Sequence, residues 1–177
     1  MTDLTRKVIN VALFQAAWFA AVLGAARGML WLGPVAMIAT LVIHLVLQEN
    51  RRGELKLLLA AGLLGVTLDT AFVVGGIFTP LQHLFPRPFS PPWMICLWLN
   101  FAATLNVSMA WLRGRYILAA AFGAVGGPLA YYSGAKLGAT EALPTTTGML
   151  LLAIGWGFMT PLLVWLAQVC GDLTNKK

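Results

Sequence analysis

The stretch Leu55–Ile77, LKLLLAAGLLGVTLDTAFVVGGI, contains only two charged side chains, Lys56 and Asp69. An α-helix needs about 20 consecutive, predominantly apolar residues to cross the hydrocarbon core of a bilayer. This stretch has that length, and glycine and threonine account for most of its non-aliphatic positions. We therefore predict that it forms a transmembrane helix.

Five further apolar stretches of similar length lie on either side of this segment. Short interruptions rich in glycine, proline and charged residues separate them, as is typical of turns between helices. We interpret the first stretch as a span rather than a signal peptide, because Gln15 interrupts its apolar run. The predicted fold is all-α, a single domain over residues 1–177 with about six transmembrane helices. The other five have approximate boundaries Lys7–Ala26, Trp31–Gln48, Pro92–Leu112, Tyr116–Leu137 and Thr147–Val169.

The composition supports a membrane protein. Of the 177 residues, 59% are apolar and only 10% are charged, against about 25% charged residues in soluble domains. The net charge of +6 could indicate nucleic acid as a partner of a soluble protein. Here the basic residues form short clusters between apolar runs, which is the pattern of topology signals. We therefore predict membrane lipids and not nucleic acid as partners.

The distribution of lysine and arginine predicts the orientation. Positively charged residues concentrate in cytoplasmic loops, and nine such residues fall on one predicted side against three on the other. Both termini are therefore expected in the cytoplasm, which requires an even number of spans, and the proline-rich loop 79–91 is expected outside. The nine are Arg6, Lys7, Arg51, Arg52, Lys56, Arg113, Arg115, Lys176 and Lys177, and the three are Arg27, Arg87 and Lys136.

Asp69 is the sharpest functional candidate, because a carboxylate within an apolar span needs a partner. It lies about eight residues from the outer end of its span, and Asn100 lies at a similar depth in the next span. We expect the two side chains to meet. Such a pair could form a proton or cation site, or hold a polar headgroup. It could also be a buried hydrogen bond that fixes helix packing.

Asn100, Thr104 and Ser108 form a polar stripe in the fourth predicted span. Their spacing of four residues places them on one helix face. A stripe of this kind either lines a hydrated cavity or bonds to a facing helix, and Gln15 is a candidate partner at mid-depth. The sequence leaves both interpretations open.

His44 lies one turn from the cytoplasmic end of the second predicted span. Histidine titrates near neutral pH and could accept a proton or bind a metal. No second histidine, cysteine or acidic residue lies near it in the sequence to complete a metal site. We therefore favour a histidine held by one hydrogen bond at the helix end, and we predict no metal.

Pro128 interrupts the fifth predicted span, where it removes a backbone hydrogen bond to Ala124. Gly126 and Gly127 precede it and Tyr131 follows within a turn. We expect a kinked or broken helix, a common location for ligand sites in membrane proteins. A simple packing kink is the alternative.

The sequence provides no basis for assigning a reaction. It contains no phosphate-binding glycine loop, no His-Glu-x-x-His, no Gly-x-Ser-x-Gly and no Cys-x-x-Cys motif. General acid–base catalysis needs convergent titratable groups, whereas His44 and Asp69 are expected at different depths. The sequence leaves enzymatic activity open but favours a protein that is not an enzyme. No cofactor is predicted.

Several short motifs occur along nearly the whole chain. They are Phe14-Gln15-x-x-Trp18-Phe19, Trp31-Leu32-Gly33, His44-Leu45, Gly65 with Asp69, Pro92-Trp93, Leu97-Trp98, Thr104-Leu105, Trp111-Leu112 and Gly127–Tyr131. Together they resemble an uncharacterised family of small bacterial inner-membrane proteins classed as a domain of unknown function. The resemblance implies a location in the bacterial inner membrane. The family is similar to proteins encoded beside cyclopropane-fatty-acid-synthase-like methyltransferases, which implies a lipid-modifying enzyme as partner.

Three hypotheses about function follow. The first is a lipid-linked role, in which the polar residues and the Pro128 kink shape an intramembrane pocket for a lipid or another hydrophobic ligand. The second is a small proton- or cation-coupled transporter with Asp69 as the coupling group. The third is a structural or partner subunit, compatible with an oligomer, whose polar groups serve packing alone.

Overall fold

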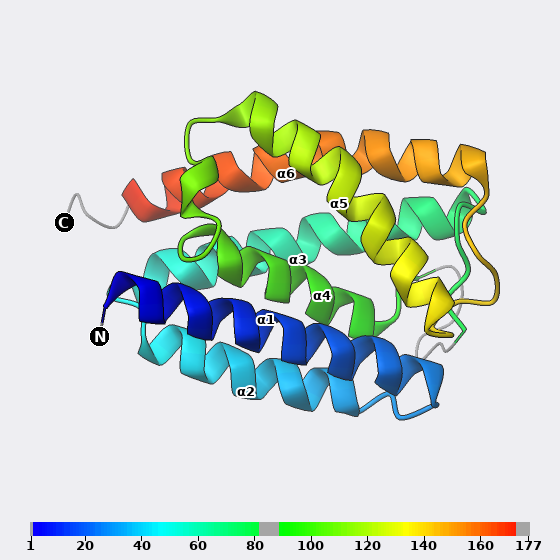
Figure 1. Cartoon of the computed structure of the whole chain (residues 1–177), viewed down its shortest axis with the longest axis horizontal. Helices are drawn as coiled ribbons and strands as arrows, with labels where there is room; N and C mark the ends of the chain where they lie inside the picture. Colours follow the sequence, from blue (N-terminus) through cyan, green and yellow to red (C-terminus); the bar gives the residue numbers. More distant parts are fainter. Residues whose placement is uncertain (1, 82–88, 173–177) are drawn as a thin grey trace.

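A computed structural model of the chain describes residues 2–81 and 89–172. These residues form an all-α structure, as predicted (Figure 1). Its α-helices are α1 (Asp3–Ala26), α2 (Leu32–Val46), α3 (Arg51–Val74), α4 (Pro92–Leu105), α5 (Tyr116–Lys136) and α6 (Thr146–Asp172), and a short 3₁₀ turn, η1 (Ala110–Leu112), precedes α5.

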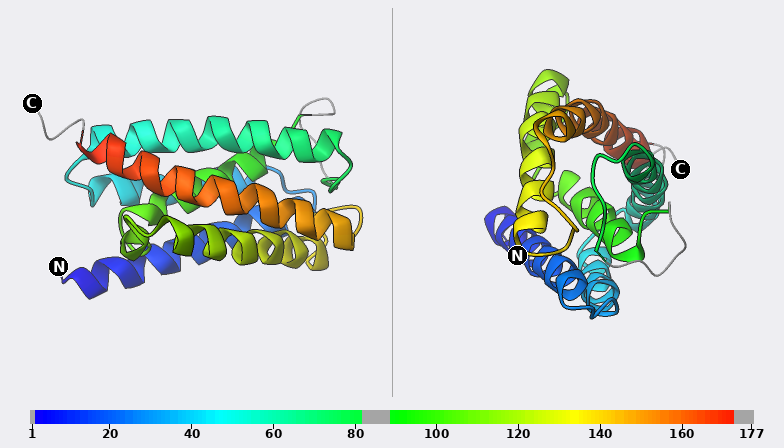
Figure 2. Two further views of the ribbon diagram at one scale, coloured as in Figure 1. Left: turned by 90° about the horizontal axis from the view of Figure 1, so that it is seen from above. Right: turned by 90° about the vertical axis from the view of Figure 1, so that its right-hand side faces the viewer.

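The helices lie side by side along the long axis of the molecule (Figure 1). Helix α4 is central, because it contacts α1, α2, α3 and α6, while α5 packs mainly along α6. Helix α1 begins and α6 ends at the same end of the bundle in both long views (Figures 1 and 2). We call this the terminal end and the opposite one the far end. The arrangement is the one that an even number of crossings requires.

The predicted fourth span is wrong beyond Leu105. Helix α4 stops there, the chain turns through residues 106–109, and η1 replaces the expected final helical turns. Two side chains hold the turn: Asn106 donates to Glu54, and Ser108 donates to Asn10. Such side-chain bonds compete with the helical backbone pattern, and this competition explains the early end of the helix.

Three helices, α1, α3 and α6, are long and apolar enough to cross a membrane. Helices α2 and α4 are apolar but have only 15 and 14 residues. Fourteen residues rise about 21 Å, less than the hydrocarbon thickness of about 30 Å. A bundle of six full spans therefore stays a prediction, as do the cytoplasmic termini. Arg87, Lys176 and Lys177, which contributed to the orientation count, lie outside the described residues.

The outer surface of the bundle is strongly apolar. Ile117 is 89% exposed, Phe158 77% and Leu63 72%, and they belong to three different helices. Soluble monomers rarely expose apolar side chains over so many neighbouring elements. This surface and the span-length helices are compatible with a membrane protein.

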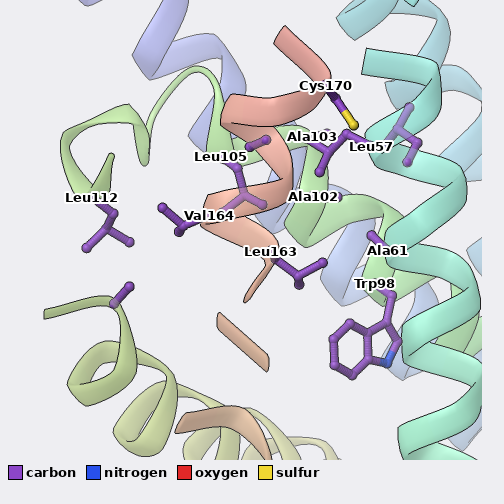
Figure 3. Packing of buried hydrophobic residues seen from close by; sticks show 13 residues of the cluster. Leu57, Ala61, Trp98, Ala102, Ala103, Leu105, Leu112, Leu163, Val164 and Cys170 are labelled. Atoms are coloured by element: carbon purple, nitrogen blue, oxygen red, sulfur yellow. The ribbon is translucent and has the colours of Figure 1, made fainter. Parts of the chain in front are cut away.

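The interior consists of two hydrophobic clusters. The larger one packs α3, α4, α5, α6 and η1 around Leu57, Trp98 and Leu163 (Figure 3). The smaller one joins Val22, Phe72 and Trp93 nearer the far end. Polar groups lie between and beside these clusters, and they form the candidate sites.

Candidate functional site

Asp69 lies at the junction of three helices. Its side chain is fully buried in α3, and its Oδ2 accepts a hydrogen bond of 2.8 Å from Nε1 of Trp98 on α4. Its Oδ1 accepts a hydrogen bond from the hydroxyl of Tyr131 on α5. Asn100 is not a partner of Asp69, so the predicted pair is wrong. Positions 98 and 100 point about 200° apart around a helix, and only Trp98 faces α3.

Aromatic rings surround this carboxylate closely. Trp98 stacks on Trp156 of α6, with centroids 4.4 Å apart and an interplanar angle of 10°. Tyr131 contacts Phe78 edge-on at 4.9 Å. An added Cβ at Gly65 would lie 2.1 Å from Cγ of Trp98, so the ring rests directly on the α3 backbone. This close packing indicates that the hydrogen bonds of Asp69 hold α3, α4 and α5 together.

Pro128 does not break α5. The helix runs continuously from Tyr116 to Lys136 with Pro128 buried inside it, so a break at Pro128 is contradicted, whereas a kink there stays a prediction. Here α6 packs tightly against the preceding glycine, since a Cβ at Gly127 would lie 2.2 Å from Cγ of Trp156.

The three residues of the predicted polar stripe, Asn100, Thr104 and Ser108, have different hydrogen-bond partners. Asn100 is 1% exposed, and its Nδ2 donates to the carbonyl of Phe14 over 2.8 Å. Its Oδ1 has no hydrogen-bond partner in the described part of the chain. Thr104 bonds locally to the carbonyl of Phe101. Ser108 lies outside the helix, in the turn that follows α4.

The partner of this stripe on α1 is Asn10 and not Gln15. The Nδ2 of Asn10 donates to the carbonyl of Ala103 over 3.0 Å, and its Oδ1 accepts from the hydroxyl of Ser108 over 2.6 Å. Gln15 is exposed on the outer surface. Asn10 is itself a polar amide in an apolar stretch, and this signal could have identified it.

His44 belongs to a buried hydrogen-bonded network near the terminal end. Its Nε2 lies 3.1 Å from Oε2 of Glu54, and the two side chains are only 2% and 5% exposed. Nδ1 of His44 lies 3.5 Å from the amide nitrogen of Gln48. His44 therefore has an acidic partner ten residues away in the sequence, which its immediate sequence neighbours did not indicate. The short α2–α3 connection brings position 54 back beside position 44.

The network continues to the surface through the turn after α4. Oε1 of Glu54 accepts a 2.7 Å hydrogen bond from Nδ2 of Asn106. Oδ1 of Asn106 in turn accepts from the guanidinium of Arg113 over 2.9 Å. The early end of α4 therefore lets a buried histidine connect to an exposed arginine.

Two cavities border this network. The outer pocket, of about 310 Å³, opens at the terminal end and is lined by polar residues that include Arg6, Gln48, Glu54, Asn106, Arg113 and Gln168. The inner cavity, of about 20 Å³, is lined by residues that include Arg6, Asn10, Thr40, His44, Gln48 and Asn100. Arg6 and Gln48 line both, so the cavities adjoin. Asp69 lines neither.

The inner cavity is large enough for one water molecule, whereas the outer pocket has the volume of a small ligand site. Within residues 2–81 and 89–172, no group of three or more histidine, cysteine, aspartate or glutamate side chains could hold a metal ion. The side chains that line these cavities can form hydrogen bonds and recognise charge.

No curated protein and no solved structure matches this chain. A family model described as protein of unknown function (DUF2878) matches residues 7–162, which is most of the sequence. The prediction of a family of unknown function is confirmed, whereas its bacterial inner-membrane location and its gene neighbourhood stay predictions. The chain belongs to the DUF2878 family of proteins of unknown function.

Proposed function

We propose that this chain is an integral protein of the bacterial inner membrane that binds a membrane lipid, with the terminal end in the cytoplasm. The polar headgroup occupies the outer pocket, and the acyl chains lie along the apolar outer surface of the bundle. In this role the protein presents lipid to a membrane lipid-modifying enzyme.

The outer pocket is the observation that carries this proposal. Its volume of about 310 Å³ falls in the range of small-ligand pockets, and its lining is polar although the rest of the molecule is rich in apolar residues. It opens where α1 begins and α6 ends, so it lies at the level where headgroups meet water. The location differs from the Asp69 pocket predicted from the sequence.

The apolar exterior supplies the second half of a lipid site. Residues such as Ile38 and Val42 of α2 are 64% and 57% exposed. Burying an acyl chain against protein is nearly neutral relative to bulk lipid, because both surroundings are apolar. Specificity must therefore come from the headgroup pocket.

Mass spectrometry of lipids retained by the protein in mild detergent tests the proposal. Gln168→Trp places a bulky ring in the outer pocket, and Gln15→Trp places the same ring on the exposed surface of α1 as a control. Wild type and Gln15→Trp should retain a specific lipid that Gln168→Trp loses. Identical lipid profiles in all three proteins would contradict the proposal.

A small coupled transporter is the second candidate, and the adjoining cavities favour it. The outer pocket leads to the inner cavity through Arg6 and Gln48, while the His44–Glu54 pair contributes one residue to each. A proton path from the terminal end toward Asn100 would need this layout. Proton flux into proteoliposomes that His44→Gln abolishes would support transport, and flux no faster than in empty liposomes would exclude it.

A further inference from the structure

Two arginines from distant parts of the chain line the outer pocket. Arg6 comes from the first turns of α1, and Arg113 comes from the connection between η1 and α5. Neither forms an ion pair with any residue that the structure describes. Among the described residues, Lys7 pairs with Asp3, and Nε2 of His44 lies 3.1 Å from the carboxylate of Glu54.

Each guanidinium is held at one nitrogen. Arg6 donates to the carbonyl of Leu47 over 3.3 Å, and Arg113 donates to Oδ1 of Asn106 over 2.9 Å. A guanidinium has five N–H donors, so several donors remain on each arginine. These two hydrogen bonds restrict the arginine side chains, but their acceptors are neutral and do not offset the positive charges.

Arg113 is positioned by buried groups. Asn106, which accepts from Arg113, donates through its own amide to Glu54, and Glu54 contacts His44. Both carboxylate oxygens of Glu54 are thus engaged inside the bundle, and the side chain is 5% exposed. Glu54 therefore holds Asn106 in place, and Asn106 in turn positions Arg113 at the pocket.

We propose that the outer pocket is a phosphate site, in which Arg6 and Arg113 together bind the phosphate of the ligand. This inference rests on the proposed function and names the chemical class of the headgroup. Guanidinium groups bind phosphate oxygens through paired, charge-assisted hydrogen bonds. Glu49 and Glu54 also line the pocket. Glu49 is exposed, so water and salt screen its repulsion, and the two oxygens of Glu54 contact His44 and Asn106.

Binding of matched lipids to the full chain in mild detergent tests the phosphate site. Native mass spectrometry compares dioleoyl phosphatidylglycerol with dioleoyl glycerol, which has the same acyl chains and no phosphate. The variants are Arg6→Ala and Arg113→Ala. Arg115→Ala is the matched control, because Arg115 is an exposed arginine two residues away that does not line the pocket.

Wild type and Arg115→Ala should retain the phospholipid about tenfold better than the diacylglycerol, and each pocket variant should lose about tenfold in retention. Arg113→Lys keeps the positive charge but loses the paired hydrogen bonds of a guanidinium. Its retention of the phospholipid should lie between that of wild type and that of Arg113→Ala. An unchanged melting temperature shows that a variant is folded. Equal retention of both lipids by wild type, or full retention by a folded Arg113→Ala variant, overturns the phosphate site.

Inorganic phosphate as a competitor identifies the source of the phosphate. If millimolar phosphate leaves the phospholipid bound, the site takes a lipid headgroup. If phosphate binds alone and neither lipid is retained, the phosphate site stands and the lipid function fails. If both lipids are retained equally, the lipid function stands and phosphate recognition fails.

Discussion

Asp69 illustrates how a buried carboxylate in an apolar bundle can be structural. It accepts hydrogen bonds from Trp98 and Tyr131, so one side chain of α3 fastens α4 and α5. Hydrogen bonds between helices in membranes contribute about 0.6 kcal/mol on average, with a maximum near 1.7 kcal/mol. Removing the acceptor costs more, because two buried donors then lack a partner.

Replacing Asp69 should therefore reduce stability in a graded way. Asp69→Asn keeps one acceptor oxygen and should lower the free energy of unfolding by about 1 kcal/mol, whereas Asp69→Leu should lower it by about 2–4 kcal/mol. Unfolding in mixed detergent micelles measures both. Lipid retention should be unchanged in the folded Asp69→Asn variant, since Asp69 lines neither cavity. Loss of lipid without loss of stability would show that Asp69 belongs to the ligand site.

The His44–Glu54 pair should respond as a coupled unit. Glu54→Leu leaves both His44 and Asn106 without their acceptor and should destabilise the protein by about 3–5 kcal/mol. The double variant His44→Leu with Glu54→Leu should be less destabilised than the sum of the single variants, because it leaves no unpaired buried partner in the pair. A double-mutant cycle in detergent measures the coupling, and additive effects would argue against a direct interaction.

At the scale of elements, the contact between α5 and α6 depends on glycine. A Cβ at Gly127 would lie 2.2 Å from the Trp156 ring, and a Cβ at Gly123 would lie 2.2 Å from Oγ1 of Thr160. Small residues at a spacing of four let helix backbones approach closely in membranes. The small-residue face therefore sets how near α5 can lie to α6.

Gly127→Ala should separate these helices and lower the free energy of unfolding by about 1–3 kcal/mol. Gly126→Ala is the matched control, because its Cβ would meet only Phe122, at 3.8 Å, and alanine has the higher helix propensity. The control should be neutral or slightly stabilising in thermal unfolding. Equal losses in both variants would mean that helix flexibility, rather than close approach, is what glycine supplies.

At the scale of the whole molecule, α1 begins and α6 ends at the same end of the bundle, and labelling can test the predicted orientation in a membrane. Thr5→Cys lies at the terminal end, and Ala142→Cys lies in the exposed α5–α6 connection at the far end. In a background with Cys96 and Cys170 replaced by serine, a membrane-impermeant maleimide added to intact spheroplasts should label only Ala142→Cys. Labelling of Thr5→Cys instead would invert the proposed orientation.

The sequence by itself determined the helical, apolar character of this protein. Apolar runs such as Leu55–Ile77 predict helices because a chain in lipid must satisfy its backbone polar groups internally. The same runs indicated most helix boundaries within a few residues, and the buried polar residues Asp69, Asn100 and His44 stood out against them. These features are local, so the order of the residues is sufficient to reveal them.

Only the tertiary structure decided which polar groups meet. Glu54 reads as part of a charged loop in the sequence, yet the turn into α3 places it beside His44, and the early end of α4 adds Asn106 and Arg113. Asp69 bonds to Trp98 instead of Asn100 because the rotation of each helix about its axis selects the facing side chain. That rotation depends on how the helices pack against one another, so the sequence of a single helix does not reveal it.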